Sequence, residues 1–515
     1  MVLEYLLLFF CTIPMTMLAA PGLSLLFAKA GYDSKKAYIP VVNQLTFLKI
    51  TGKHPANIIL EYIPVINIFS FVLDLIDFVR CYDRKSFWEQ MATLFLYPIY
   101  FIIIGKKADV KYLGTLKEVE ATQPRGKWYS SLLFAIVAAT LIRWAFIEAY
   151  KIPTSSMEGN MLVNDFLFVS KIHYGPRTPE TPLQVPLTHQ RFPLLGFKSF
   201  SEAIKLPSFR FFGLSTIQRN KPLVFNWPHD TSVAHTDMKM FYVKRCVGIA
   251  GDTVTFKNAQ LYINGKPVED NDKVQYRYAF KVTENVVKDV TEEIDGNGRQ
   301  IFVSRLRKEV IDEWGLVNNE DFHQDQTHFN IVYAHLSKSN IDRVKRSKFV
   351  DSTYFHKLVA GANDYPYGGE PIFPYYGNKV LDGSILGEYK FKWNVDHFGP
   401  LWLPKKGVTI AMNPDNVTLY ANSIARYEGY DEGEVTVSNK KLYIKGQPQD
   451  QYTFKQNYYW LVGDNRHNSL DSRYWGFVPE DHVVGKPFIT FFSYNKYATS
   501  PFTKIRWNRI FRFVE

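Results

Sequence analysis

The longest apolar runs of this 515-residue chain all lie before residue 151, and this uneven distribution divides the chain into two parts. A helix crosses a bilayer with about 20 residues. Four segments meet that length: residues 3–28, 58–79, 87–105 and 130–150. Pro98 interrupts the third of them. The sequence therefore predicts a multi-span transmembrane region over residues 1–105 and a final transmembrane helix over residues 130–150.

The charges of the connecting loops predict how these helices are oriented. Residues 29–57 carry five Lys against one Asp, and residues 106–129 carry five Lys and one Arg against three acidic residues. Because Lys and Arg accumulate in cytoplasmic loops, both loops are predicted to be cytoplasmic. The second of them is predicted to cover residues 106–129. The first apolar run follows no Lys or Arg, so we interpret it as a retained span rather than a secretory signal. Four spans then place everything after residue 150 outside, in the periplasm of a bacterium with two membranes.

The overall charge and the cysteines exclude several classes of protein. The net charge is +11, but the basic residues form no continuous run and the only dense group is residues 342–348. The Lys and Arg residues that accumulate in the cytoplasmic loops of membrane proteins explain part of this excess positive charge, so nucleic-acid binding is not predicted. Of the three cysteines, Cys11, Cys81 and Cys246, only the last follows residue 151, so the second part has no internal disulfide. The sequence contains no CxxC or HExxH pair, and no metal site is predicted.

The second part reads mainly as strands, with helical signals strongest at residues 305–314 and 340–349. Short alternating or apolar runs, separated by Gly, Pro, Asn and Asp, are typical of strands. The sequence predicts strands at residues 166–171, 223–227, 242–249, 253–256, 408–412 and 459–462.

An internal repeat is visible within this part. Residues 254–267 read VTFKNAQLYINGKP, and residues 435–448 read VTVSNKKLYIKGQP. Each copy predicts two strands around an Asn-centred turn, followed by a Gly-containing turn. The copies bracket an insertion at residues 271–405, which divides the β core into residues 151–270 and 406–515. The insertion is either a solvated surface subdomain or a docking surface for substrates or another membrane protein.

Three stretches carry the chemistry: residues 151–162 (KIPTSSMEGNML), 241–254 (FYVKRCVGIAGDTV) and 461–480 (LVGDNRHNSLDSRYWGFVPE). Together they resemble the sequence boxes of bacterial type I signal peptidases (leader peptidases), the serine endopeptidases with a Ser/Lys dyad. The third stretch carries the most specific part of this resemblance. The resemblance covers the last predicted span and the β core on both sides of the insertion.

A lysine can act as the base for a serine only under particular conditions. No His lies in or beside the first two stretches, and an ordinary Lys, with a pKa of about 10.4, is almost never neutral at pH 7 unless it is desolvated. On a strand, residues two apart share a face, so Lys244 would lie between Tyr242 and Cys246, which can exclude water. The sequence gives Lys244 a route to burial, and it gives Arg245 none.

The resemblance implies roles for individual residues. Ser156, rather than Ser155, would be the nucleophile and Lys244 the general base, while the Ser156 N–H and the Thr154 hydroxyl would stabilise the oxyanion. Ser469 would hydrogen-bond and orient Lys244, and Asp471 and Arg473 would form a structural ion pair. The loop is expected to be fixed by Asp464, Asn465 and Arg466. Shallow substrate pockets are expected to be shaped by Ile152, Pro153, Met157, Tyr242 and Val243.

The chain departs from the family pattern at a few positions. Residues 157–160, Met-Glu-Gly-Asn, replace the usual Met-x-Pro-Thr, and His467 stands where an acidic residue is common. Lys221 and Pro222 interrupt the usual Gly-Asp entry to a strand. His467 suggests a rival Ser156/His467/Asp471 triad, which leaves Lys244 unexplained.

A purely structural interpretation of the first stretch is also open. Thr154, Ser155 and Ser156 could form a helix N-cap cluster, since Glu158 follows at a suitable spacing.

The predicted fold is a membrane-anchored, mainly β protein, in which an α-helical transmembrane region precedes a periplasmic β-sheet catalytic domain with an α+β insertion. The resemblance implies a signal peptidase I of the inner membrane that cleaves exported preproteins after small-x-small sites such as Ala-x-Ala. It implies no cofactor. The expected partners are signal peptides, the lipid bilayer and the protein translocation machinery. The alternative is a non-catalytic membrane-anchored scaffold or binding protein of the export machinery.

Overall fold

The chain divides into two compact units, one formed by residues 1–146 with 184–188 and the other by residues 147–183 with 189–515. The computed structural model describes most of both. The described residues are 12–62, 66–122, 128–192, 196–284, 286–294, 300–314, 316, 322–324, 328, 330–362, 372–376, 390–495 and 504–514.

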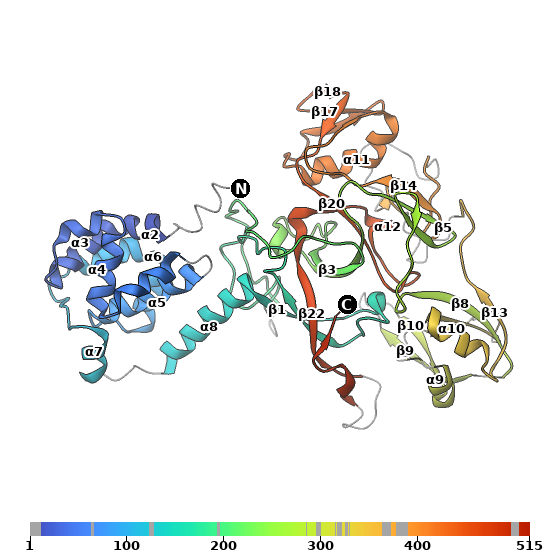
Figure 1. Ribbon diagram of the computed structural model, residues 1–515, viewed down its shortest axis with the longest axis horizontal. Helices are drawn as coiled ribbons and strands as arrows, with labels where there is room; N and C mark the ends of the chain where they lie inside the picture. Colours follow the sequence, from blue (N-terminus) through green and yellow to red (C-terminus); the bar gives the residue numbers. More distant parts are fainter. Residues whose placement is uncertain are drawn as a thin grey trace. The chain divides into compact units, whose positions relative to one another are not determined.

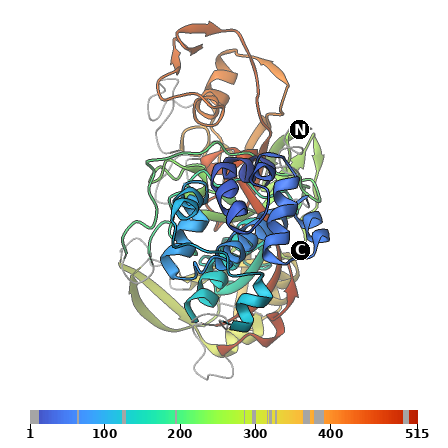
Figure 2. The same ribbon diagram turned by 90° about the vertical axis from the view of Figure 1, so that its left-hand side faces the viewer.

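The first unit is helical, and Figure 2 draws its helices in blue to cyan. Its apolar core includes the stacked rings of Phe47 and Phe78, with Phe101 packed beside them. The described helices are α2 (Thr12–Leu18), α3 (Ala20–Lys29), α4 (Val42–Thr51), α5 (Ile66–Arg80), α6 (Phe87–Lys106), α7 (Leu116–Thr122) and α8 (Trp128–Ala145), with the 3₁₀ segments η1 (Ser34–Tyr38) and η2 (Pro55–Tyr62).

None of the helices in the described residues is both long and apolar enough to cross a membrane. The predicted segment 87–105 coincides with α6, whose backbone is non-helical at Leu96, close to Pro98. Residues 3–11 of the first predicted segment lie outside the described part. The prediction of a helix through residue 150 is wrong. After α8 ends, the chain forms strand β1 (Ile147–Lys151), because these residues hydrogen-bond to β2 (Asp165–Ser170).

The second unit is built on an antiparallel sheet with the order β1-β2-β22-β3-β4-β20-β21, and β23 pairs with β22 (Figure 1). Short segments η3 (Ser155–Met157), η4 (Thr236–Met238), α12 (Ser472–Trp475), η7 (Glu480–His482) and η8 (Trp507–Arg509) connect its strands. The further strands of this sheet are β3 (Lys221–Asn226), β4 (Phe241–Gly248), β20 (Tyr458–Val462), β21 (Val478–Pro479), β22 (Val483–Ser493) and β23 (Arg512–Phe513).

Strand β20 shows why the centre of this sheet is apolar on both faces. All of its residues are buried. Tyr458, Trp460 and Val462 pack into one apolar cluster, while Tyr459 and Leu461 pack into another. Alternate side chains of a strand point to opposite faces, so the two clusters lie on opposite sides of the sheet.

The predicted repeat is confirmed as two meanders with equivalent registers. One consists of β5 (Thr253–Lys257), β6 (Gln260–Ile263) and β7 (Lys266–Pro267), and the other of β16 (Val435–Ser438), β17 (Lys441–Ile444) and β18 (Gln447–Gln449). Both turns of each copy have positive φ at their central residues, which the two-residue hairpin turn requires.

The insertion region contains a second sheet, of order β11-β12-β8-β13, with an apolar core around Phe280, Trp314 and Val332. Its elements are β8 (Gln275–Val282), β9 (Val287–Ile294), β10 (Gln300–Leu306), α9 (Lys308–Trp314), β11 (Phe322–Gln324), β12 (Ile331–Ser337), α10 (Lys338–Lys345) and β13 (Val350–Phe355). The chain then returns through β14 (Phe398–Trp402), which pairs with β5. It continues through β15 (Thr409–Ala411), α11 (Pro414–Tyr427) and, after the second meander, β19 (Gln451–Thr453).

Candidate active site

Lys244 is held in the middle of the central sheet. Its strand, β4, pairs with β3 on one side and β20 on the other, and Lys244 lies opposite Leu223. The strand alternation that the sequence suggested brings the Tyr242 ring to 5.4 Å from the Lys244 ammonium. Lys244 is only 4% exposed, so its side chain is almost completely removed from water.

Ser156 lies in the 3₁₀ turn η3, a few residues beyond the end of β1. Its side chain is buried, and the Lys244 Nζ donates a hydrogen bond of 2.7 Å to the Ser156 Oγ. Two residues 88 positions apart in the chain therefore form a direct polar pair inside the protein. This distance lies within the range in which a base can accept the proton of a serine hydroxyl.

The surroundings of Lys244 change its acidity. Burial lowers the pKa of Lys244 to about 8, against the Asp471 and Asp464 carboxylates, which raise it. At a pKa of 8, about one in ten such side chains is neutral at pH 7, compared with fewer than about one in a thousand for an exposed lysine. The pair can therefore supply a neutral amine next to a serine hydroxyl at physiological pH.

Thr154 is exposed, and its Oγ1 lies 3.4 Å from the Ser156 Oγ. The N-cap interpretation of this stretch predicts a hydrogen bond from a side-chain oxygen to the following turn. The Thr154 side chain makes no such capping bond. The N-cap prediction is therefore wrong, and the Thr154 hydroxyl faces the serine.

The burial of Arg245 contradicts one prediction. We expected no route to burial for this residue, yet it is 3% exposed. Its guanidinium donates two hydrogen bonds of 2.6 Å to the carboxylate of Asp464, which is itself fully buried. The partner comes from the third stretch, and a bidentate pair of this kind allows a buried arginine to keep its charge.

The loop after β20 holds the main chain at Ser156. The Asn465 N–H donates to the Ser156 carbonyl at 3.1 Å, and the Asn468 side-chain amide donates to the Ser155 Oγ at 3.0 Å. Arg466 contributes through its N–H, which bonds the Gln275 carbonyl at 2.9 Å. Asn465 therefore fixes the backbone of Ser156 and Asn468 holds the neighbouring Ser155, roles that spacing alone does not reveal.

Ser469, Asp471 and Arg473 are all buried beside the pair. Arg473 and Asp471 form the expected ion pair at 2.8 Å. Burial raises the pKa of Asp471, but the Arg473 charge and hydrogen bonds outweigh it, so this pKa lies below its ordinary value. The Ser469 hydroxyl is buried and makes no hydrogen bond to Lys244 among the described residues.

Gly463 explains how closely these groups pack. A Cβ added to Gly463 would lie 2.2 Å from the Ser469 Oγ and 2.5 Å from the Ser156 carbonyl oxygen. Such distances are shorter than any van der Waals contact, so only glycine fits between the catalytic loop and the nucleophile.

The rival triad is not formed. The His467 Nε2 lies 2.7 Å from the Asp396 Oδ1, and its Nδ1 accepts the Arg277 N–H at 3.1 Å. Both ring nitrogens are thereby engaged with residues other than Ser156 and Asp471.

The five candidate substrate residues divide into two groups. Ile152, Met157 and Val243 belong to one apolar cluster, and the first two are almost completely buried. Tyr242 packs into a different cluster and stacks on Trp227 at 5.3 Å. Pro153 is exposed.

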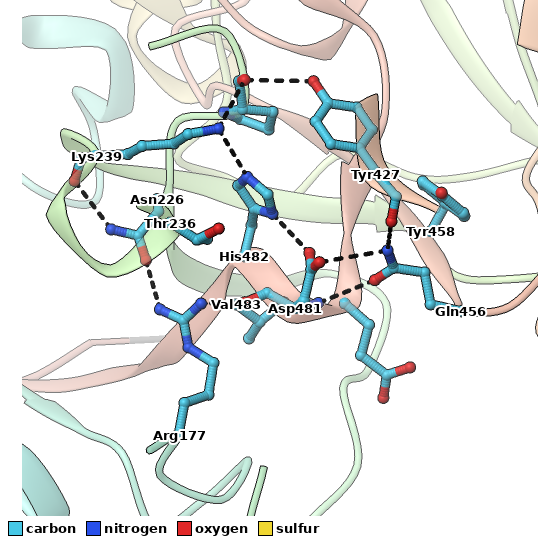
Figure 3. A network of polar contacts seen from close by, with 12 residues as sticks. Arg177, Asn226, Thr236, Lys239, Tyr427, Gln456, Tyr458, Asp481, His482 and Val483 are labelled. Atoms are coloured by element: carbon cyan, nitrogen blue, oxygen red, sulfur yellow. Dashed lines mark hydrogen bonds and ion pairs between the residues drawn. The ribbon is translucent and has the colours of Figure 1, made fainter. Parts of the chain in front are cut away.

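A second polar network, partly buried, lies at the ends of β3 and β4 (Figure 3). His482 lies between Lys239, at 3.3 Å from its Nε2, and Asp481, at 2.6 Å from its Nδ1. The Asn226 side chain bonds the Lys239 carbonyl and accepts from Arg177. Burial lowers the pKa values of Lys239 and His482, since both lose hydration as cations. Sequence analysis did not identify this network, whose members lie up to about 300 residues apart.

Comparisons with known proteins agree with this geometry. The family model described as "Signal peptidase, peptidase S26" matches residues 125–305 and 406–492, just over half of the chain. A family of unknown function (DUF5684) matches residues 35–115.

Three relatives are named signal peptidase I. The protein from Rickettsia massiliae is 30% identical over 179 residues, which are 35% of this chain and 56% of that protein. The Buchnera aphidicola protein (strain Sg) is 23% identical over 74% of this chain and 79% of its own length. The Helicobacter pylori protein (strain J99) is 22% identical over 75% of this chain and 92% of its own length. Because the family match covers just over half of the chain, the chain belongs to the signal peptidase family, peptidase S26.

Proposed function

We propose that Ser156 is the nucleophile and Lys244 the general base of a signal peptidase I reaction on exported preproteins. The observation that carries this proposal is the 2.7 Å hydrogen bond between the Lys244 Nζ and the Ser156 Oγ, both of which are buried. Burial brings the pKa of Lys244 to about 8, close to the operating pH, where a base is most effective.

The reaction proceeds in two halves. The Ser156 Oγ attacks the scissile carbonyl carbon while Lys244 takes its proton, and the resulting oxyanion is stabilised by the Ser156 N–H and the Thr154 hydroxyl. Lys244 then gives the proton to the leaving amine as the peptide bond breaks. In the second half, Lys244 takes a proton from water as the water oxygen attacks the ester carbon. Lys244 then gives this proton to the Ser156 Oγ as the ester C–O bond breaks, which restores the serine hydroxyl and releases the carboxyl group of the product.

Substrate choice follows from the residues around the serine. Ile152 and Met157, on either side of Ser156 in the chain, are almost completely buried in one apolar cluster, which supports shallow pockets that accept only small side chains. Val243, Tyr242 and Pro153 line the remainder of the proposed cleft. The preferred site is small-x-small, typically Ala-x-Ala, and replacing its final Ala with Leu should abolish cleavage.

The proposal includes a multi-pass anchor in the inner membrane of a bacterium, with the catalytic unit on the periplasmic side. The apolar segments before residue 151 and the basic loops between them support it. Anchoring would present the serine where translocated signal peptides emerge, near the translocation machinery, and raise their effective concentration. A reporter fused after Lys151 should be active only outside the cytoplasm, and activity confined to the cytoplasm would contradict this topology.

The experiment that tests the chemistry is cleavage of an Ala-x-Ala preprotein by the purified full-length protein. Wild type is compared with Ser156→Ala and Lys244→Met, the second of which keeps the length and apolar stem of the side chain. Thermal unfolding of each variant controls for folding. Cleavage by wild type and loss in both folded variants is the expected result.

Two outcomes would contradict the proposal. If Lys244→Met retained cleavage, the base would be another group. If wild type cut nothing while another signal peptidase cut the same preprotein, and a serine-reactive lactam failed to label Ser156, the chain would be a non-catalytic binding or scaffold protein.

A further inference from the structure

The beginning of the insertion packs directly against the turn that carries the nucleophile. Gly159 has φ +92°, and a Cβ placed on it would lie 2.1 Å from the Lys273 carbonyl oxygen. Backbone touches backbone at this point, and only a residue without a side chain permits such an approach. Gly159 lies within residues 157–160, where the chain departs from the Met-x-Pro-Thr pattern of its family.

The same segment of the insertion is hydrogen-bonded to the catalytic loop. Gln275, the first residue of β8, forms a parallel bridge with Asn465. The Gln275 N–H donates to the Asp464 carbonyl at 2.8 Å, and the Arg466 N–H donates to the Gln275 carbonyl at 2.9 Å. Strand β8 thus continues past the insertion's own sheet and pairs with the loop of the β core.

His467 is the next residue of the loop, and both of its ring nitrogens contact the insertion. Its Nδ1 accepts the Arg277 N–H, so the ring proton lies on Nε2 and faces Asp396 at 2.7 Å. Asp396 is 1% exposed and also accepts the Leu358 N–H at 2.8 Å. Burial raises the pKa of Asp396, but the interactions with His467, the Leu358 N–H and the Arg473 charge together outweigh burial and keep that pKa below the ordinary value.

The loop that His467 anchors is the loop that holds Ser156. Asn465 lies two residues before His467 and bonds the Ser156 carbonyl, while Asn468 follows His467 directly and bonds the Ser155 hydroxyl. A shift of this loop would therefore be transmitted to the nucleophile. A displacement of about 1 Å at a catalytic group can cost about a hundredfold in rate.

We propose that His467 is a positioning residue that fastens the insertion to the catalytic loop and thereby sets the position of Ser156. The insertion is then a working part of the active site. Two departures from the family pattern, Gly159 and His467, are among the places where the β core contacts the insertion. This inference rests on the proposed roles of Ser156 and Lys244.

Three variants of full-length protein test it through kcat and KM on an Ala-x-Ala preprotein. His467→Ala removes both contacts. His467→Asn keeps an acceptor at the position of Nδ1 and so keeps the bond to Arg277. His235→Ala is the control, because His235 is a buried histidine of the same unit, and its Nδ1 bonds Thr181 at 2.8 Å, away from the catalytic loop.

The expected result is a fall in kcat of at least tenfold for His467→Ala, with KM within twofold of wild type. His467→Asn should recover kcat to within about threefold of wild type, and His235→Ala should keep its kcat even if it melts at a lower temperature. A merely structural histidine would lower thermal stability without this division between kcat and KM.

The outcomes separate this inference from the proposed function. If wild type cleaves but His467→Ala has an unchanged kcat, the inference alone is overturned. It is also overturned if His467→Asn is as impaired as His467→Ala, or if His235→Ala loses kcat to the same extent. If wild type fails to cleave and Ser156 is not labelled by a serine-reactive lactam, the proposed function is overturned and this inference with it.

Discussion

The pH dependence of cleavage tests whether burial of Lys244 provides the base. Only the neutral amine accepts the Ser156 proton, so kcat/KM should rise about tenfold per pH unit below pH 8 and level off above it. Tyr242→Ala removes the ring that lies 5.4 Å from the Lys244 Nζ and admits water. The pKa of Lys244 should then rise, and the midpoint of the profile should move to higher pH. Tyr242→Phe keeps the ring and should leave the midpoint unchanged.

The size of the effect follows from the two limits of the Lys244 pKa. If Tyr242→Ala restored the ordinary pKa of about 10.4, the neutral fraction at pH 7 would fall from about one in ten to about one in 2,500, a loss of about 200-fold. At pH 10 the same change would cost only about fourfold. These values are upper limits, because replacing one side chain exposes Lys244 only in part.

The assay is the initial rate of preprotein cleavage between pH 6 and pH 10 at substrate concentrations below KM, with thermal unfolding followed at each pH. An equal loss at pH 7 and pH 10 in Tyr242→Ala would refute the reasoning, since lost substrate contact is independent of pH. A wild-type profile that is flat between pH 6 and pH 8 would refute it as well.

Three further predictions concern packing and charge. Lys244→Met removes a buried ammonium and should raise the free energy of unfolding at pH 7 by up to about 3 kcal/mol. Between about pH 8 and pH 10.5 the folded wild type binds fewer protons than its unfolded chain, so its stability increases as the pH rises. The stability gain of Lys244→Met, measured by thermal unfolding, should therefore disappear by pH 10.5. Gly463→Ala should lower kcat about a hundredfold with a folded protein, because its Cβ would meet the Ser156 carbonyl at 2.5 Å; an unchanged kcat would show that the loop yields freely. Arg245→Ala leaves the fully buried Asp464 uncompensated and should destabilise the protein by about 3–5 kcal/mol, whereas a loss below about 1 kcal/mol would mean that water reaches the carboxylate.

Local patterns predicted much of the β structure. Strands were expected at residues 223–227, 242–249 and 459–462, and the structure has them as β3, β4 and β20. The turns of the repeat were also correct, because Asn and Gly tolerate positive φ and so mark hairpins. Alternation along β4 correctly placed Lys244 beside Tyr242, since this depends only on neighbours in one strand.

Helix α11 was missed although its sequence contains a signal. Asn413 caps the helix and Pro414 occupies its first position, a combination that typically begins helices. Val417, Ile424 and other buried residues follow at helical spacing. Residues 147–150 show the opposite error, because a helix was predicted where the structure has strand β1. Their apolar character continues that of α8, and the pairing with β2 that overrides it lies beyond the reach of a local pattern.

Arg245 and Lys244 show what a sequence cannot supply. The two cations are neighbours on β4, and both are almost completely buried. Arg245 faces Asp464, 219 residues away, and the bidentate pair stabilises its charge. The hydrogen bond of Lys244 goes instead to the Ser156 hydroxyl, which brings no negative charge, so burial lowers its pKa. Burial alone therefore does not distinguish the two cations. The difference between them arises because the fold gives a carboxylate to Arg245 and a hydroxyl to Lys244, and because segments far away in the chain deliver both partners.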